Sequence, residues 1–401
     1  MSTEKKQLVP ELRFPEFEND EGWKIQPLGE IGKPLMCKRI LKEQTTTNSK
    51  NAIPFYKIGT FGRKPDAFIP LKLYNEYKKK YSFPNIGDIL ISASGTIGRL
   101  VVFDGVDAYF QDSNIVWIGN DETQIINTLL YYCYSNLVWQ TSDGGVIKRL
   151  YNSNLKEIEI YYPKNTKEQQ KIAYCLTSLD HLITAETEKL DHLKDHKKGL
   201  LQQLFPANGE TKPQYRFPEF EDDGDWVETT LDNCLDYLQP TPYLVSSTNY
   251  DDEFETPVLT AGKTFILGYT DETEGIFKKD LPVIIFDDFT TATKFVDFHF
   301  KVKSSAMKIL LAKSDNNIKF LFETIQNLKF EVSTHKRHWI SIYSKLNILK
   351  PKSSKEQQKI ADCFSSVDNL IESQTQKVKA LKKHKKGLMQ KLFPKVNELA
   401  I

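Results

Sequence analysis

Two long segments of the chain carry apolar residues at alternating spacings of three and four. The first stripe consists of Leu176, Leu179, Ile183, Leu190, Leu193, Leu200 and Leu204, interrupted by Glu186 and Lys197. The second consists of Phe364, Val367, Ile371, Val378, Leu381, Leu388 and Leu392, interrupted by Gln374 and Lys385. This spacing keeps each stripe on one helix face and is typical of a coiled-coil seam. We therefore expect two long helices, with polar interruptions at corresponding positions that fix the pairing register.

The two segments are copies of one sequence. Residues Lys167 to Pro206 return as Lys355 to Pro394, a shift of 188 positions, with 25 of 40 residues identical. The opening Arg-Phe-Pro-Glu-Phe at position 13, followed by Trp23, also returns at position 216, followed by Trp226. Between these shared frames lie two inserts, residues 32–147 and 235–335, that do not resemble each other. A repeated frame with unlike inserts indicates two related domains that present different surfaces.

The repeat predicts the domain organisation. We expect a first recognition domain at 1–165, a first spacer helix at 166–206, a second recognition domain at 207–353 and a second spacer helix at 354–401. Because domain termini usually lie close together, the second helix should begin near the end of the first, which makes the pair antiparallel and the whole a pseudo-twofold tandem repeat. A helix from Glu168 to Leu204 extends about 55 Å at 1.5 Å per residue. That length could separate two DNA-reading domains, although the coil could also serve only for dimerisation or as a scaffold.

The inserts read mainly as strands and turns. Buried-strand patterns occur at 87–92, 100–103 and 114–118 in the first insert, and at 257–259 and 283–286 in the second. A short strand also precedes each long helix, at 158–160 and 346–348. The expected fold class is therefore α+β, with two mixed α/β domains separated by an antiparallel two-helix coiled coil.

Charge limits the kind of nucleic-acid contact that is possible. The net charge is only +1, so any DNA-binding cations must act locally. The best local candidates are the pair Lys148-Arg149 followed by Tyr151, which aligns with Lys336-Arg337 followed by Trp339. Arginine can contact guanine or phosphate, and lysine is more often a phosphate contact. A solvated cationic surface without function explains the same residues equally well.

A glycine-containing turn in the first insert offers a second set of contacts. The segment 92–99, Ser-Ala-Ser-Gly-Thr-Ile-Gly-Arg, presents Ser94, Thr96 and Arg99 together with backbone amides that could hold a phosphate or reach into a groove. A plain hairpin turn is the alternative. Weaker candidates of the same kind are Lys57, Arg63, Lys64, Lys263, Thr291 and Lys294.

Several functions lack their sequence signals. Ala261-Gly-Lys-Thr264 is not a P-loop, because Pro257 stands where the motif needs glycine. We find no Asn-Pro-Pro or Asp-Pro-Pro pattern typical of base methyltransferases, and no dinucleotide, metalloprotease or hydrolase motif. The five cysteines form no zinc or disulfide pattern, and no apolar run is long enough for a membrane span. We therefore expect a cytoplasmic protein without a membrane segment, without a metal site and without catalytic residues of its own.

The combined layout resembles a known family. Two Arg-Phe-Pro-Glu-Phe openings, the segment Gly-Asp-Ile-Leu-Ile-Ser-Ala-Ser-Gly-Thr-Ile-Gly at 87–98 and two helices beginning Lys-Glu-Gln-Gln-Lys-Ile-Ala are similar to specificity subunits of type I restriction-modification systems. The second insert departs from this pattern, since it has no obvious copy of the glycine loop.

The resemblance implies a non-catalytic DNA-recognition subunit of a methyltransferase and endonuclease complex. Each domain would read one half of a split site on double-stranded DNA, and the helices would set the spacer between the halves. Two methyltransferase subunits and the restriction subunits would dock on it, and S-adenosylmethionine, ATP and Mg would belong to those partners. The rival interpretations are a coiled-coil scaffold that never touches DNA and an enzyme fused to its own reader.

Overall fold

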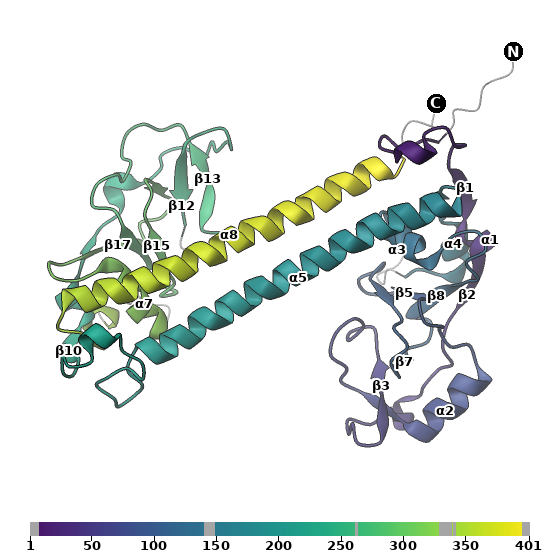
Figure 1. Cartoon of the computed structure of the whole chain (residues 1–401), viewed down its shortest axis with the longest axis horizontal. Helices are drawn as coiled ribbons and strands as arrows, with labels where there is room; N and C mark the ends of the chain where they lie inside the picture. The colour runs from purple at the N-terminus through teal and green to yellow at the C-terminus, as the bar shows by residue number, and fades with distance from the viewer. Residues whose placement is uncertain (1–7, 140–148, 261–263, 329–338, 340–341, 395–401) are drawn as a thin grey trace, which may run out of the picture. The chain divides into compact units, whose positions relative to one another are not determined.

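The computed structural model of the chain describes residues 8–139, 149–260, 264–328, 339 and 342–394 (Figure 1). Two helices of 39 residues each dominate it, α5 (Thr166–Leu204) and α8 (Ser354–Leu392). Contacts divide the chain into two units, one formed by Met1–Ala185 with Val378–Ile401 and the other by Glu186–Lys377. Each unit therefore contains a part of both long helices.

The first unit is a mixed α/β domain. A four-stranded antiparallel sheet has the order β2-β8-β5-β6, and a smaller sheet has the order β4-β3-β7, in which β3 and β7 are parallel. A separate strand pair, β1 with β9, lies beside the start of α5. Its elements are η1 (Pro15–Phe17), β1 (Lys24–Pro27), α1 (Leu28–Ile31), β2 (Gly32–Leu35), η2 (Lys42–Gln44), β3 (Ala52–Tyr56), β4 (Phe68–Pro70), α2 (Leu71–Lys80), β5 (Ile89–Ser92), β6 (Leu100–Val102), β7 (Tyr109–Phe110), β8 (Ile115–Asn120), α3 (Asn127–Ser135), α4 (Asn152–Glu157) and β9 (Glu159–Tyr162).

The second unit repeats this topology strand for strand. Its larger sheet has the order β11-β17-β14-β15, its smaller sheet the order β13-β12-β16 with β12 and β16 parallel, and β10 pairs with β18. Its elements are η3 (Pro218–Phe220), β10 (Val227–Thr230), α6 (Leu231–Cys234), β11 (Leu235–Leu238), η4 (Thr241–Tyr243), β12 (Thr256–Leu259), β13 (Ile266–Thr270), β14 (Val283–Asp287), β15 (Thr293–Val296), β16 (Lys301–Val302), β17 (Met307–Ala312), α7 (Ile318–Asn327), η5 (Tyr343–Lys345) and β18 (Asn347–Lys350). The two inserts therefore share one fold although their sequences diverge.

A buried ion pair explains why the openings and the helix starts are repeated together. Arg13 donates from Nε and Nη2 to the two carboxylate oxygens of Glu168, each at 2.8 Å, and the indole of Trp23 lies 3.4 Å from the same carboxylate. Arg216 makes the same pair of bonds to Glu356 at 2.8 and 2.7 Å. Each Arg-Phe-Pro-Glu-Phe opening is thus fastened to the first turn of a long helix.

The end of one long helix completes the core of each unit. In the first unit Phe393, just beyond the last turn of α8, packs edge-on against Trp23 with ring centroids 5.6 Å apart. In the second, Phe205, just beyond α5, packs against Trp226 at 5.9 Å. The repeated Leu-Phe-Pro therefore serves as the packing end of each helix.

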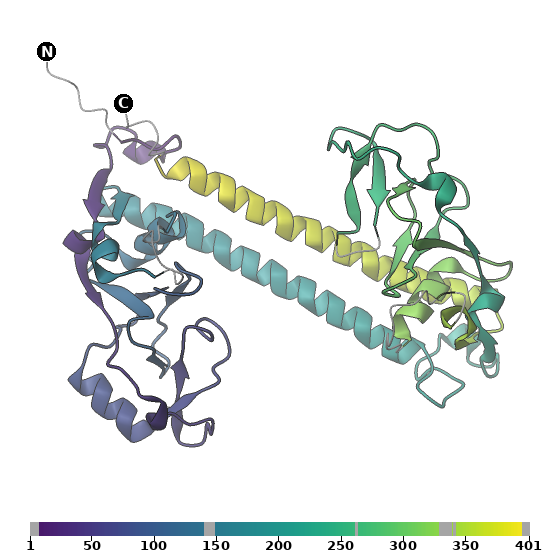
Figure 2. The same cartoon turned by 180° about the vertical axis from the view of Figure 1, so that it is seen from behind.

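Within each unit, α5 and α8 lie side by side (Figures 1 and 2). Every predicted seam position is buried or half-buried, and Leu176 and Phe364 are fully buried. The polar interruptions make specific contacts. Gln374 donates to the carboxylate of Glu186 at 2.6 Å, and Lys385 pairs with Asp180. In the second unit Glu186 contacts Gln374 and Lys197 contacts Asp368, so positions that rise along α5 fall along α8 and these segments run antiparallel.

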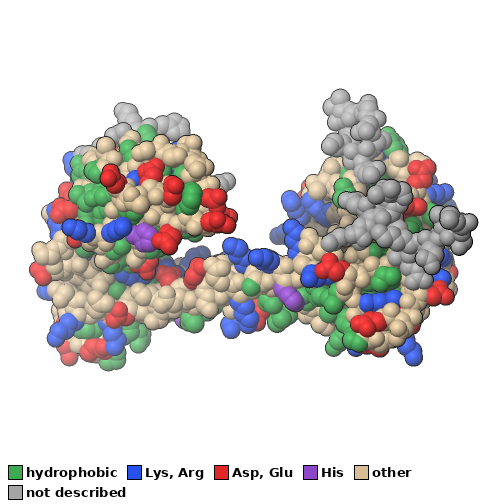
Figure 3. Space-filling view, turned by 90° about the horizontal axis from the view of Figure 1, so that it is seen from above, with side chains coloured by type: hydrophobic (Ala, Val, Ile, Leu, Met, Phe, Trp, Pro, Cys, Tyr) green, Lys and Arg blue, Asp and Glu red, His purple; other side chains and the backbone are tan. Residues whose placement is uncertain are grey.

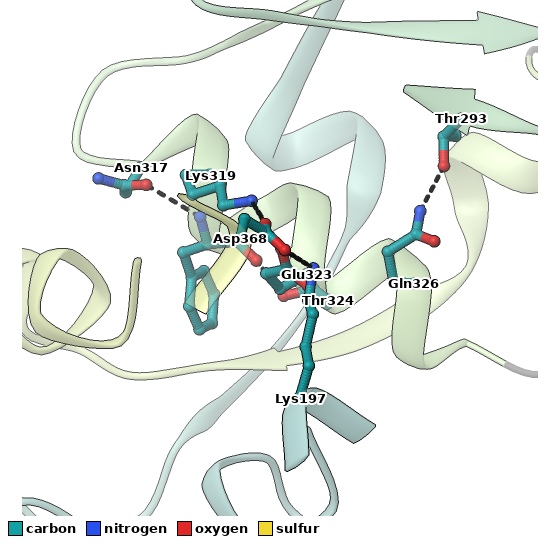
Figure 4. A network of polar contacts seen from close by, with 9 residues as sticks. Lys197, Thr293, Asn317, Lys319, Glu323, Thr324, Gln326 and Asp368 are labelled. Atoms are coloured by element: carbon teal, nitrogen blue, oxygen red, sulfur yellow. Dashed lines mark hydrogen bonds and ion pairs between the residues drawn. The ribbon is translucent and has the colours of Figure 1, made fainter. Parts of the chain in front are cut away.

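Lys197 belongs to a larger polar network in the second unit (Figure 4). Its ammonium contacts Asp368 of α8 at 2.8 Å and Glu323 of α7 at 3.0 Å, and Lys319 of α7 contacts both carboxylates. Burial acts to raise the pKa of Asp368, but the hydrogen bonds and charges of Lys197 and Lys319 outweigh it, and the pKa lies below its ordinary value. The network connects α7 to both long helices.

Candidate nucleic-acid interface

The glycine turn forms the loop of the β5–β6 hairpin in the first unit. Ser92 closes it, because its hydroxyl donates to Thr96 O at 2.6 Å and accepts from Arg99 N at 2.8 Å. Gly95 and Gly98 have φ values of +64° and +81°, in the left-handed region that favours glycine. A Cβ on Gly98 would lie 2.1 Å from the ring of Trp139. The loop is therefore a fixed turn, with Gly95 and Thr96 exposed at its tip.

The structure brings Arg149 to this loop. Its backbone forms a β-bridge with Ser94, and its Nη2 donates to Ser113 O at 3.0 Å. The guanidinium also lies 6.0 Å from the centroid of the exposed Tyr151 ring. The glycine loop and Arg149, which are more than fifty positions apart in the sequence, therefore lie side by side in the fold.

Ser94 has a different role from the one predicted. Its hydroxyl donates to the side chain of Asn114 at 2.8 Å, and the residue is buried. It holds the loop in place, and its side chain is not available for an outside ligand.

Arg63 and Arg99 line one hollow beside the loop. Arg99 Nη1 donates to Phe61 O at 2.8 Å, which fixes its orientation. The hollow, of about 310 Å³, is lined by Ile58, Gly59, Arg63, Ser92, Gly95, Thr96 and Arg99. Two guanidinium groups beside an exposed hydroxyl suit an anionic group such as a DNA phosphate. Lys64, which follows Arg63 in the sequence, is exposed. Lys57 forms a surface ion pair with Asp66 at 2.9 Å.

Only part of the predicted set in the second unit can be placed. Thr291 lies in the β14–β15 loop, and the exposed Lys294 lies on β15 with its ammonium 5.8 Å from the ring centroid of Phe265. Lys148, Lys263, Lys336 and Arg337 lie outside the described residues.

Trp339 is a correction to the predicted set. It is 1% exposed and packs against Phe286 and Tyr343, with ring centroids 5.1 and 6.2 Å away. Tyr151, its counterpart in the sequence repeat, is 54% exposed. Trp339 is therefore a core residue and not a DNA contact, because the second unit supplies aromatic partners at this position.

The surface carries mixed charge. Lys and Arg side chains are interspersed with Asp and Glu over the face seen in Figure 3. Among the described residues, no group of three or more His, Cys, Asp or Glu is arranged to hold a metal ion, and none of the helices has the length and apolar character needed to cross a membrane.

Comparison with known proteins gives consistent results at the level of sequence. Residues 20–195 match the family model described as the type I restriction modification DNA specificity domain. A Haemophilus influenzae protein, whose name provisionally assigns it to the type I restriction enzyme specificity subunits, is 56% identical over 171 residues, which are 43% of this chain and 44% of that protein. The specificity subunit of the Escherichia coli type I restriction enzyme EcoR124I/EcoR124II is 53% identical over 123 residues, 29% of this chain and 30% of its own. The matched region thus spans less than half the length of both relatives.

A solved structure extends the likeness to the fold of almost the whole chain. The crystal structure of the S subunit of a type I restriction-modification system from M. genitalium superposes with a TM-score of 0.70 at 15% identity, and the match covers 97% of this chain and 100% of that one. At this identity the likeness is one of fold.

Proposed function

Since residues 20–195 match the model of the type I restriction modification DNA specificity domain, we propose that the chain is a non-catalytic specificity subunit that binds double-stranded DNA. Each unit reads one half of a two-part site. The observation that carries this proposal is one strand topology built twice, with the same Arg–Glu fastening but unlike hairpin loops. Two unlike sequences can be read by such a pair of domains.

The long helices act in this proposal as an antiparallel coiled coil that sets the spacer, with pseudo-twofold symmetry between the repeats. Support comes from the buried and half-buried seam positions and from the matched pairs Lys385–Asp180 and Lys197–Asp368. A helix of 39 residues extends about 58 Å. That exceeds the separation of about 34 to 36 Å between two successive major-groove sites on one face of DNA.

The chemistry belongs to partner proteins. Two methyltransferase subunits that use S-adenosylmethionine dock on the subunit, and restriction subunits that use ATP and Mg join them. The net charge of +1 supports such partners, because phosphate contacts normally dominate DNA affinity and this chain provides few cations in excess. The subunit itself supplies recognition and a scaffold.

A gel-shift comparison tests the proposal against a scaffold that does not bind DNA. The chain is combined with its methyltransferase subunits and presented with genomic fragments in competition with DNA of scrambled sequence. The proposal predicts a preference for particular fragments. Equal retention of all fragments would favour the scaffold, and methylation by this chain alone would favour a fused enzyme.

Arg149→Ala is the matching residue test in the first unit. Removing the guanidinium beside the glycine loop should weaken recognition of one half-site by roughly tenfold, the lower range of one specific arginine contact. A uniform loss on every sequence would reassign Arg149 to phosphate contact.

A further inference from the structure

The β14–β15 hairpin of the second unit occupies the same place in its sheet as the glycine hairpin of the first unit. Both hairpins join the third and fourth strands of the larger sheet. Ala93 N, at the start of the first loop, donates at 2.8 Å to the carbonyl of the residue before β8. Asp288 N donates at 3.1 Å to the carbonyl of the residue before β17. The loops are therefore structural counterparts, although only the first contains glycine.

A backbone N–H of the segment that precedes the long helix also bonds to the base of each loop. In the first unit Leu150 N donates to Ala93 O at 2.8 Å, and in the second Trp339 N donates to the carboxylate of Asp288 at 2.9 Å. Asp288 is buried and lies 3.4 Å from the buried ammonium of Lys308. On the other side of the loop, Gln326 of α7 donates to Thr293 at the start of β15 at 2.6 Å (Figure 4). The second loop thus has a fixed base.

The tip of this loop presents an aromatic ring. Phe289 is 42% exposed, and Thr290 beside it is exposed as well. The carboxylate of Asp287 accepts from the backbone N–H groups of Phe289 and Thr290 at 2.8 and 2.7 Å, which orders the turn. A large apolar side chain on an ordered and exposed turn does not contribute its full area to the core.

Thr291 follows in a strained conformation. Its φ is +58°, whereas the left-handed residues of the first loop are both glycine. A β-branched residue is an outlier in this region because its Cβ crowds the backbone. Backbone strain of this kind clusters at functional sites and binding surfaces.

We propose that Phe289 and Thr291 determine the DNA sequence read by the second unit. Phe289 contacts the methyl group of a thymine in the major groove, and the hydroxyl of Thr291 bonds to an adjacent base edge; both contacts are within the repertoire of these side chains. This inference rests on the proposed function and adds the residues that read the second half-site. Because the β14–β15 loop differs in sequence from the glycine loop, the second unit reads a half-site different from that of the first.

Selection of bound duplexes from a random library tests the inference. Four forms of the full chain are compared, each with its methyltransferase subunits: the wild type, Phe289→Ala, Thr291→Gly and, as the matched variant in the first loop, Thr96→Gly. Both second-unit variants should lose preference at base pairs of one half-site only, and Thr96→Gly should affect only the other half-site. Replacing the contacted thymine by uracil should weaken wild-type binding roughly fourfold, as expected for one methyl group, and should leave Phe289→Ala unaffected.

Thr291→Gly also separates function from folding. Glycine relieves the positive φ, so the thermal midpoint should be unchanged or higher while recognition of the half-site is lost. The inference is overturned if both second-unit variants select the wild-type site, or if their loss of binding follows a loss of stability. If the wild-type complex selects no sequence at all, the proposed function fails as well, which distinguishes the two failures.

Discussion

Arg13 and Arg216 each place a guanidinium against a buried glutamate in the first turn of a long helix. Removing two charges from water costs free energy, and here two parallel hydrogen bonds and an indole N–H offset that cost. The pair thus fastens the start of each domain to its helix through a glutamate side chain that is only 1% exposed. Loss of one partner would leave the other as an uncompensated buried charge.

The variants Glu168→Gln and Glu356→Gln should therefore each destabilise one unit. We expect a loss of about 3–5 kcal/mol of unfolding free energy, the range for breaking a buried ion pair. Hydrogen exchange should accelerate in residues 8–35 for the first variant and in residues 216–238 for the second. Glu16→Gln, which removes the exposed pair with Lys171, is the control and should change little. If either variant accelerated hydrogen exchange equally in both units, the ion pair would not belong to one unit alone.

The network around Asp368 makes stability depend on acidity. Its pKa is lowered in the folded chain because Lys197 and Lys319 outweigh the effect of burial. A carboxylate with a lowered pKa contributes stability above its unfolded value of about 3.9, and that contribution is lost as the pH falls through the lower folded value. The difference in unfolding free energy between wild type and Asp368→Asn should be constant above about pH 5 and should shrink below about pH 4. Urea unfolding across this pH range measures the difference, and Asp252→Asn, at an exposed position, is the control. A difference that grows as the pH falls would show that Lys197 and Lys319 do not stabilise the Asp368 carboxylate.

At the scale of elements, each long helix ends inside a core. Phe393 follows α8, yet it packs against Trp23, which lies more than 300 positions earlier in the sequence. Phe205 performs the same packing against Trp226. Both units therefore depend on helix ends that are remote in sequence or belong to the preceding repeat.

Phe393→Ala should consequently destabilise the first unit, and Phe205→Ala the second. Truncation of a buried phenylalanine costs about 3–5 kcal/mol. Limited proteolysis should cut first within residues 8–135 for Phe393→Ala, and within residues 226–328 for Phe205→Ala. Leu182→Ala, on an exposed position of α5, provides the comparison. Cleavage confined to the last helix in Phe393→Ala would show that the first unit folds without it.

Some elements could be predicted from the sequence because their signals are local. The three-and-four spacing predicts both long helices, and the apolar run before Ser92 predicts β5. The counterpart of the glycine hairpin could not be predicted, because backbone bonds such as that from Asp288 N define it and leave no side-chain pattern. Trp339 was predicted to contact DNA because it aligns with Tyr151 in the repeat, but its ring packs against Phe286 and Tyr343, which the repeat does not reveal. Arg13 and Glu168 repeat together in the sequence, and only the fold shows that they touch.

At the scale of the whole molecule, the helices are expected to act as a ruler. Removing residues 187–193 and 375–381 deletes one seven-residue repeat from each helix and preserves the seam. Seven helical residues span about 10 Å, which corresponds to about three base pairs of DNA. The spacer of the recognised site should shorten by about that amount while both half-sites keep their sequences. An unchanged spacer would show that the helices do not set it.

The central claim is that two units of one fold read two different DNA sequences at a set distance. Sequencing the methylated adenines in cells that contain this chain and its methyltransferase subunits tests it most directly. We predict a single asymmetric site, in which two specified blocks flank a spacer of constant length and unspecified sequence. One uninterrupted block, or methylation that is the same in cells without the chain, would contradict it.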